Sequence, residues 1–212
     1  MFNLLGGLVA LAVSYYAFRY GRVAGSGFLR ILSLGFMLLG VGLLAQASAF
    51  IIFDLNGAKI SDRGVFVYGA TVVYLALQAS AYLMIAISYA RRVQGGAVVA
   101  TEAAAAGGLQ IASNPSSLLL FGTHVFEFGE LILVVLVALI VFQGLLIYGE
   151  GRNRRALTVL GAFSLILGAH VAKLSASVLS SGLIYLVGSL VQLAGFGLLL
   201  LFLLRSGPDG GN

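Results

Sequence analysis

Six long apolar segments, separated by short polar or basic stretches, make up most of this chain. They lie at residues 2–18, 29–53, 65–90, 118–148, 156–179 and 183–204. A helix of about 20 mainly apolar residues is long enough to cross the hydrocarbon core of a bilayer. Only 9% of the 212 residues are charged, whereas soluble domains carry about 25%, so most of the surface must contact lipid. The sequence therefore predicts an all-α, polytopic integral membrane bundle in the cell membrane.

A seventh and weaker segment lies in the middle of the chain, at residues 95–117. It is rich in alanine and glycine, and it carries Glu102 and Gln110 before the turn signal Asn114-Pro115. An acidic residue in the middle of a membrane helix costs about 2.5 to 3.5 kcal/mol on insertion scales. Taken alone, the segment is therefore either a weak membrane crossing or a helix or loop on the membrane surface.

The distribution of basic residues favours a crossing by this segment. With seven crossings, one side of the membrane receives nine arginines and the other side receives only Lys59 and Arg63. With six crossings the same basic residues divide five against six. In natural membrane proteins, lysines and arginines are strongly biased toward the cytoplasmic side. We therefore predict seven transmembrane helices with the N-terminus outside and the C-terminus inside, and six helices as the alternative. The nine arginines are Arg19, Arg22, Arg30, Arg91, Arg92, Arg152, Arg154, Arg155 and Arg205.

The segments on either side of the weak segment resemble each other. LQASAYLMIAISYAR at 77–91 aligns with VQLAGFGLLLLFLLR at 191–205, which pairs Gln78 with Gln192. Parallel repeats of this kind are known in transporters. We therefore predict one membrane domain with a 3+1+3 plan. Its parts are a three-helix unit at 1–92, a linker helix at 93–117, a second three-helix unit at 118–205 and a flexible tail at 206–212.

The 3+1+3 plan resembles that of the SWEET and PQ-loop transporters, in which one linker helix joins two three-helix units. The resemblance is confined to architecture, because the chain has no Pro-Gln pair and only two prolines, Pro115 and Pro208. Seven helices with an external N-terminus also resemble the plan of microbial rhodopsins. That family holds retinal on a lysine of its last helix, and residues 183–204 contain no lysine.

Several polar side chains interrupt the apolar segments. Such groups are costly in a membrane and usually face a bundle interior or a water-filled cavity. Measured from the inner ends of their segments at about 1.5 Å per residue, most of them fall near the middle of the bilayer. We expect them to form a polar cavity that binds a small solute or protons, the alternative being hydrogen bonds between neighbouring helices. The candidate site residues are His170, Glu102, Gln78, Gln192, Gln46 and Tyr74.

Glu130 and Lys173 are predicted to form an ion pair. The basic turn at 149–155 makes the flanking segments an antiparallel hairpin, and the register then places these two residues at one depth near the outer boundary. A buried pair often serves only to fix helix register. Glu130 and Lys173 are therefore interpreted as a structural tether, with a gate or proton relay as the alternative.

The chain has two histidines, His124 and His170. Axial ligands of a b-type haem must meet the iron from opposite sides at one depth, and the register separates these two by roughly 14 Å at 1.5 Å per residue. We expect no cofactor, and haem b remains a minor alternative. His124 and Glu127 lie one turn apart and form a weak metal pair without a visible third ligand, so an exposed helix end is the other interpretation.

Other chemistry is scarce in this sequence. The chain has no cysteine, which excludes disulfides and thiolate metal sites, and no pattern of nucleophile, histidine and acid indicates an enzyme. Its basic residues lie in short clusters typical of an anionic lipid surface and not of a nucleic-acid-binding face. We predict a small-solute or proton-linked transporter or binding bundle. The alternatives are a non-catalytic subunit or anchor that contacts other membrane subunits or further copies of the chain, and a haem or quinone electron-transfer subunit.

Overall fold

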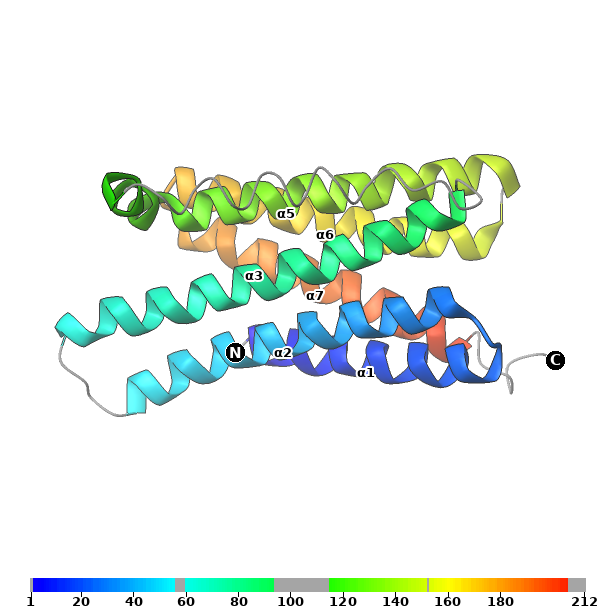
Figure 1. Cartoon of the computed structure of the whole chain (residues 1–212), viewed down its shortest axis with the longest axis horizontal. Helices are drawn as coiled ribbons and strands as arrows, with labels where there is room; N and C mark the ends of the chain where they lie inside the picture. Colours follow the sequence, from blue (N-terminus) through cyan, green and yellow to red (C-terminus); the bar gives the residue numbers. More distant parts are fainter. Residues whose placement is uncertain (1, 56–59, 94–114, 152, 206–212) are drawn as a thin grey trace.

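The computed structural model describes residues 2–55, 60–93, 115–151 and 153–205, and every regular element in this part of the chain is an α-helix (Figure 1). Each of the six described helices is long and apolar enough to cross a membrane. The all-α, multi-pass prediction is therefore confirmed. The helices are α1 (Phe2–Val23), α2 (Gly27–Leu55), α3 (Ile60–Val93), α5 (Pro115–Gly151), α6 (Arg154–Val178) and α7 (Gly182–Arg205).

The described part of the chain contains six candidate crossings, and it does not show the predicted seventh. The weak segment at 95–117, including Glu102, lies outside the described residues as far as 114, and the helix α5 begins at Pro115.

Two helices are longer than their apolar segments indicate, because α3 has 34 residues and α5 has 37. The start of α6 carries a conventional cap, in which the side-chain oxygen of Asn153 accepts a hydrogen bond of 2.9 Å from the backbone N–H of Arg155.

The six helices pack as a closed ring in the order α1, α2, α3, α5, α6, α7, with α7 returning to α1. Two contacts between aromatic side chains of α3 and α6 show how these helices run. Tyr82 contacts His170, and Tyr89, which lies later on α3, contacts Phe163, which lies earlier on α6. The two helices are therefore antiparallel. Helices α5 and α6 are also antiparallel, because α6 begins directly after α5 ends and packs against it. It follows that α3 and α5 run in the same direction (Figure 1).

These directions bring most arginines of the described helices to one end of the bundle, which we call the arginine-rich end. Ends of α1, α3 and α7 and starts of α2 and α6 meet there. The positive-inside rule associates such an end with the cytoplasmic side of a membrane. The arginines at this end are Arg19, Arg22, Arg30, Arg91, Arg92, Arg154, Arg155 and Arg205.

Glycines allow two helix pairs to approach backbone to backbone, as small residues do in membrane bundles. A Cβ atom built on Gly7 of α1 would lie 3.1 Å from the carbonyl oxygen of Gly40 of α2, and the reverse distance is also 3.1 Å. On α7, Cβ atoms on Gly188 and Gly195 would each lie 3.0 Å from a carbonyl oxygen of α6. The second pair matters for the candidate site, because it holds α7 close to the polar face of α6.

Candidate functional site

Three polar side chains from three helices form a hydrogen-bonded chain in the bundle interior. The Oε2 atom of Glu130 on α5 lies 2.7 Å from Nδ1 of His170 on α6. The Nε2 atom of the same ring lies 3.0 Å from the hydroxyl of Tyr82 on α3. All three side chains are fully buried. Both ring nitrogens of His170 are therefore engaged, one by a carboxylate and one by a phenol.

With Glu130 ionised, these contacts match one protonation pattern. An ionised carboxylate only accepts hydrogen bonds, so Nδ1 of His170 then carries the proton and donates a hydrogen bond to Glu130. The bare Nε2 atom then accepts a hydrogen bond from the hydroxyl of Tyr82. Such a chain can pass a proton along its length, because histidine gains and loses protons readily and both of its nitrogens have a partner.

Lys173 lies one helical turn beyond His170 on the same face of α6 and is also fully buried. Its Nζ atom donates a short hydrogen bond to Oε1 of Gln192 on α7. The same atom lies 5.7 Å from the ring centroid of Tyr185, which is within the range of a cation–π interaction. A buried ammonium group is thus held by one amide oxygen and one aromatic face.

The structure corrects the predicted direct contact between Glu130 and Lys173. No ion pair of these two residues is formed, since Glu130 contacts His170 and Lys173 contacts Gln192. The residue level with Glu130 is His170, three positions from the expected partner. Two residues of the predicted solute site, His170 and Gln192, are therefore the partners of the two residues of the predicted tether. We call the interacting buried polar side chains of this region the buried network, and they are Tyr74, Gln78, Tyr82, Glu130, His170, Lys173 and Gln192.

Several atoms of the buried network have hydrogen-bonding capacity that the described residues do not use. They are the Tyr74 hydroxyl, both amide atoms of Gln78, Oε1 of Glu130 and Nε2 of Gln192. Buried polar groups in proteins are nearly always hydrogen-bonded to protein atoms or to ordered water. The network therefore offers donors and acceptors of both kinds to water or to a small polar molecule.

Two other predicted site residues do not join the network. Gln46 is buried on α2, but its Oε1 atom accepts a hydrogen bond of 2.8 Å from the amide of Asn3 on α1. Glu102 lies outside the described residues. The network also sits nearer the outer end than the predicted middle position, because His170 is about 24 Å from the start of α6 and about 12 Å from its end at 1.5 Å per residue.

His124 and Glu127 lie at the end of the bundle opposite the arginine-rich end. The Nδ1 atom of His124 is 2.6 Å from Oε2 of Glu127, and Ser177 donates a hydrogen bond of 3.0 Å to the other carboxylate oxygen. The His124 side chain is 58% exposed. Among the described residues, no group of three potential ligands could hold a metal ion.

The two histidines do not fit a haem. His124 is exposed and paired with Glu127, whereas His170 is buried with both ring nitrogens hydrogen-bonded. An axial ligand needs one ring nitrogen directed at the iron. The two histidines therefore do not direct a pair of free ring nitrogens at one point.

A cavity of about 610 Å³ opens at the arginine-rich end of the ring. Its mouth includes Ser26, Asn153 and Arg155, whereas its walls are mainly apolar residues of α2, α5, α6 and α7. This cavity is not the predicted polar cavity, because none of the predicted site residues lines it. The cavity is an apolar chamber, and the polar groups lie deeper in a separate packed cluster.

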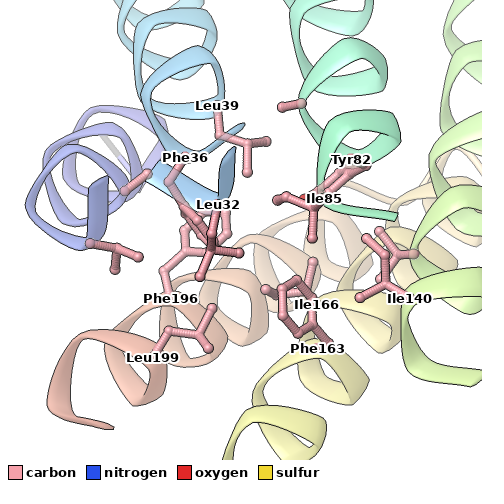
Figure 2. Close-up of a cluster of buried hydrophobic side chains, with 14 of the residues drawn as sticks. Leu32, Phe36, Leu39, Tyr82, Ile85, Ile140, Phe163, Ile166, Phe196 and Leu199 are labelled. Carbon is pink, nitrogen blue, oxygen red and sulfur yellow. The ribbon is translucent and has the colours of Figure 1, made fainter. Parts of the chain in front are cut away.

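Aromatic side chains line the cavity on the side of the buried network, and Figure 2 shows Phe36, Phe163 and Phe196 within the cluster of buried hydrophobic side chains. We call Phe36, Tyr89, Phe163 and Phe196 the aromatic layer. The ring centroids of Phe36 lie 6.5 Å from Phe163 and 6.1 Å from Phe196, and those of Tyr89 and Phe163 lie 6.1 Å apart. Phe163 precedes His170 by two turns of α6. The aromatic layer and the buried network therefore lie about 10 Å apart along this helix.

Two residues of this region were not among the predicted site residues. Tyr82 bonds His170, and Tyr185 lies over Lys173. Tyr82 has a signal in the sequence, because it lies one turn from Gln78 on the same face of its helix. Tyr185 has no comparable signal, since its contact depends on how α7 is rotated against α6.

We expect the protonation pattern of His170 to be visible by nitrogen NMR of histidine-labelled protein. His124→Gln leaves His170 as the single labelled ring, which should show one protonated and one bare nitrogen. Adding Tyr82→Phe removes the donor to Nε2, so the resonance of that nitrogen should move while the Nδ1 resonance stays close to its position. Two protonated ring nitrogens at neutral pH would contradict the pattern.

Comparison of the chain with protein family models, with characterised proteins and with solved structures finds no match. Its function is therefore inferred from its own geometry.

Proposed function

We propose that this protein is a proton-linked carrier of a small anionic solute. The observation that carries the proposal is the fully buried chain of Glu130, His170 and Tyr82 beside the buried Lys173. Ionisable groups inside a membrane bundle are costly, and they commonly mark solute or proton pathways. One carboxylate oxygen of Glu130 and the amide of Gln78 also have hydrogen-bonding capacity that a solute or water could use.

Charge balance supports the coupling of an anion to a proton. With Glu130 ionised, His170 neutral and Lys173 protonated, the buried network has no net charge. An anion entering alone, or a proton entering alone, would leave an uncompensated charge in a low-dielectric interior, which is expensive. An anion that enters together with one proton keeps the network neutral. Lys173 and the amide Nε2 of Gln192 supply donors for the anion, and Glu130 with His170 accepts the proton.

The cavity at the arginine-rich end serves as the inner vestibule of this pathway. Its basic mouth attracts anions, and its apolar walls suit a solute with some apolar surface. We place the closed gate of this pathway at the aromatic layer, where the ring of Phe36 packs against Phe163 and Phe196. Transport therefore requires that Phe36 and Phe163 separate while the outer side stays closed, as alternating access demands.

The seven-crossing topology belongs to this proposal. Helix α3 ends at the arginine-rich end, and the parallel helix α5 begins at the opposite end. We propose that residues 94–114 carry the chain back across the membrane, since about 20 residues of helix span a bilayer. This crossing keeps the N-terminus outside, the C-terminus inside and the arginines on the inside.

The two-unit repeat is likewise proposed. Gln78 and Gln192 occupy equivalent positions in the alignment, and both are buried. Tyr82 and Phe196 are equivalent in the same way, and both also face the interior. Aligned residues of α3 and α7 therefore both face the bundle interior. This supports an internal repeat that relates residues 1–92 to residues 118–205.

A second candidate function is that of a subunit or anchor in a larger complex or homo-oligomer. The observation that favours it is the apolar flank of α5, the least buried of the six candidate spans. Exposed residues on this flank include Leu131, Val135, Phe142 and Leu146. Lipid also covers such a flank, and a subunit has no need of the buried network, so the carrier is the better-supported function.

The carrier proposal is tested in liposomes that contain the purified protein and the luminal pH dye pyranine. Sodium salts of chloride, nitrate, methanesulfonate and benzenesulfonate are added outside at equal pH. Their acids are too strong to cross as neutral molecules, so coupled entry of proton and anion acidifies the lumen. We expect acidification with at least one of these anions and about a hundredfold lower rate in Glu130→Gln, which corresponds to about 2.7 kcal/mol.

The matched control is Glu127→Gln, which replaces a carboxylate with a carboxamide one turn away on α5, at a partly exposed position. This variant should keep the rate of the unchanged protein. Size-exclusion chromatography and circular dichroism establish that Glu130→Gln remains folded. Equal rates for Glu130→Gln and the unchanged protein, or no acidification above protein-free liposomes with any of the four anions, would refute the carrier.

A further inference from the structure

A second concave site lies on the outside of the ring, between the start of α6 and the end of α7. The groove has a volume of about 260 Å³. Its lining combines arginine side chains with aliphatic and aromatic side chains. The lining residues are Arg154, Arg155, Thr158, Leu198, Leu201, Phe202 and Arg205.

The groove is amphipathic along the direction of the membrane normal. Leu198, Leu201, Phe202 and Arg205 follow the spacing of one face of a helix, so an apolar stripe on α7 ends in an arginine. Leu201 is 53% exposed, whereas Leu198 and Phe202 are partly buried against the core, so the stripe lies along the outer edge of the bundle. The apolar part therefore lies at the depth of lipid acyl chains, and the arginines lie at the depth of headgroups.

The three arginines of the groove have no carboxylate partner in the described part of the chain. The contacts between basic and acidic side chains found there are His124 with Glu127 and His170 with Glu130. Surface charges of one sign normally repel, so three guanidinium groups around one groove indicate a site for an anion. The planar guanidinium group binds phosphate oxygens two at a time.

We infer that this groove binds an anionic phospholipid of the leaflet at the arginine-rich end. Arg154, Arg155 and Arg205 hold the headgroup phosphate, and an acyl chain lies over Leu198 and Leu201. Basic pockets between transmembrane helices on the cytoplasmic side bind anionic headgroups in this way. Inorganic phosphate shares the headgroup chemistry, but it does not explain the exposed apolar stripe that continues from the arginines into the bilayer.

The lipid site touches the vestibule without being part of the buried network. Arg155 and Phe202 line both the groove and the cavity, so these two side chains form the wall between them. A bound lipid that holds Arg155 would stabilise this wall. The inference does not rest on the carrier function, because it concerns a different surface and is tested by binding alone.

Native mass spectrometry of delipidated protein in detergent provides the test. Phosphatidylglycerol and phosphatidylcholine with the same acyl chains are added at equal concentrations. We expect one phosphatidylglycerol molecule to bind about tenfold or more tightly than phosphatidylcholine, given a contribution of about 1 kcal/mol for each basic residue near the headgroup. The triple variant Arg154→Gln, Arg155→Gln and Arg205→Gln should lose this preference.

The matched control removes the same number of charges from the same end of the bundle. Arg19→Gln, Arg22→Gln and Arg30→Gln lie on α1 and α2, away from the groove, and should keep the preference for phosphatidylglycerol. An equal loss in both triple variants would show general attraction to anions and overturn the site. Equal binding of both lipids, or displacement of phosphatidylglycerol by millimolar inorganic phosphate, would overturn the assignment to lipid.

Discussion

Replacing Glu130 with alanine is expected to lower the free energy of unfolding by about 3 to 5 kcal/mol. The change removes the carboxylate that bonds His170 and leaves Lys173 as a buried cation without a compensating negative charge. Both groups are fully buried, so solvent does not screen the loss. The measurement is an unfolding titration with sodium dodecyl sulfate in mixed micelles, followed by circular dichroism.

Two further variants separate the charge effect from simple truncation. Glu127→Ala removes a carboxylate from the same helix at a partly exposed position and should cost less than about 1 kcal/mol. Combining Glu130→Ala with Lys173→Met removes both buried charges and should recover more than half of the lost stability. Equal losses for Glu127→Ala and Glu130→Ala would contradict the central role assigned to Glu130.

Replacing Gly195 with leucine is expected to destabilise the pair of helices α6 and α7. A Cβ atom at this position would lie 2.8 Å from Cγ1 of Ile166 and 3.0 Å from the carbonyl oxygen of Ala162, so the helices would have to move apart. Overpacking of this kind costs about 1 to 3 kcal/mol, and more where backbone atoms must move. Gln192 lies one turn away, so the same movement should weaken its hydrogen bond with Lys173.

The control for this change lies two residues further along the same helix. A Cβ atom on Gly197 would meet no heavy atom within 4 Å, so Gly197→Leu should leave stability within about 0.5 kcal/mol of the unchanged protein. Both variants add the same side chain to α7, and both are measured by the same titration. Similar losses for the two variants would show that the cost comes from the leucine and not from the close approach of the helices.

The membrane class and the position of each described helix could be predicted because hydropathy is a local property. Each of the six apolar segments became a helix, and the positions of the arginines indicated which helix ends lie together. The longer extents of α3 and α5 were not predictable from apolar residues, because polar residues continue both helices beyond the expected spans.

The identity of the buried polar residues was also predictable, whereas their partners were not. Gln46, Tyr74, Gln78, Glu130, His170, Lys173 and Gln192 are all buried, as expected for groups that cannot face lipid. Counting along a hairpin gives depth to within about one turn, or about 5 Å. The depths of Lys173 and His170 differ by less than one turn, so counting residues selected the wrong partner for Glu130.

The sequence by itself determined which segments enter the membrane and which side chains must avoid lipid, because both follow from the solvation of single residues and their neighbours along the chain. The tertiary structure decided that Glu130 contacts His170, that Lys173 contacts Gln192, and that the cavity is apolar and lies apart from both. These features depend on the rotation and separation of helices about their axes. Those parameters are set by the summed packing of many residues, such as the approach of Gly195 to Ala162, and no single position in the sequence specifies them.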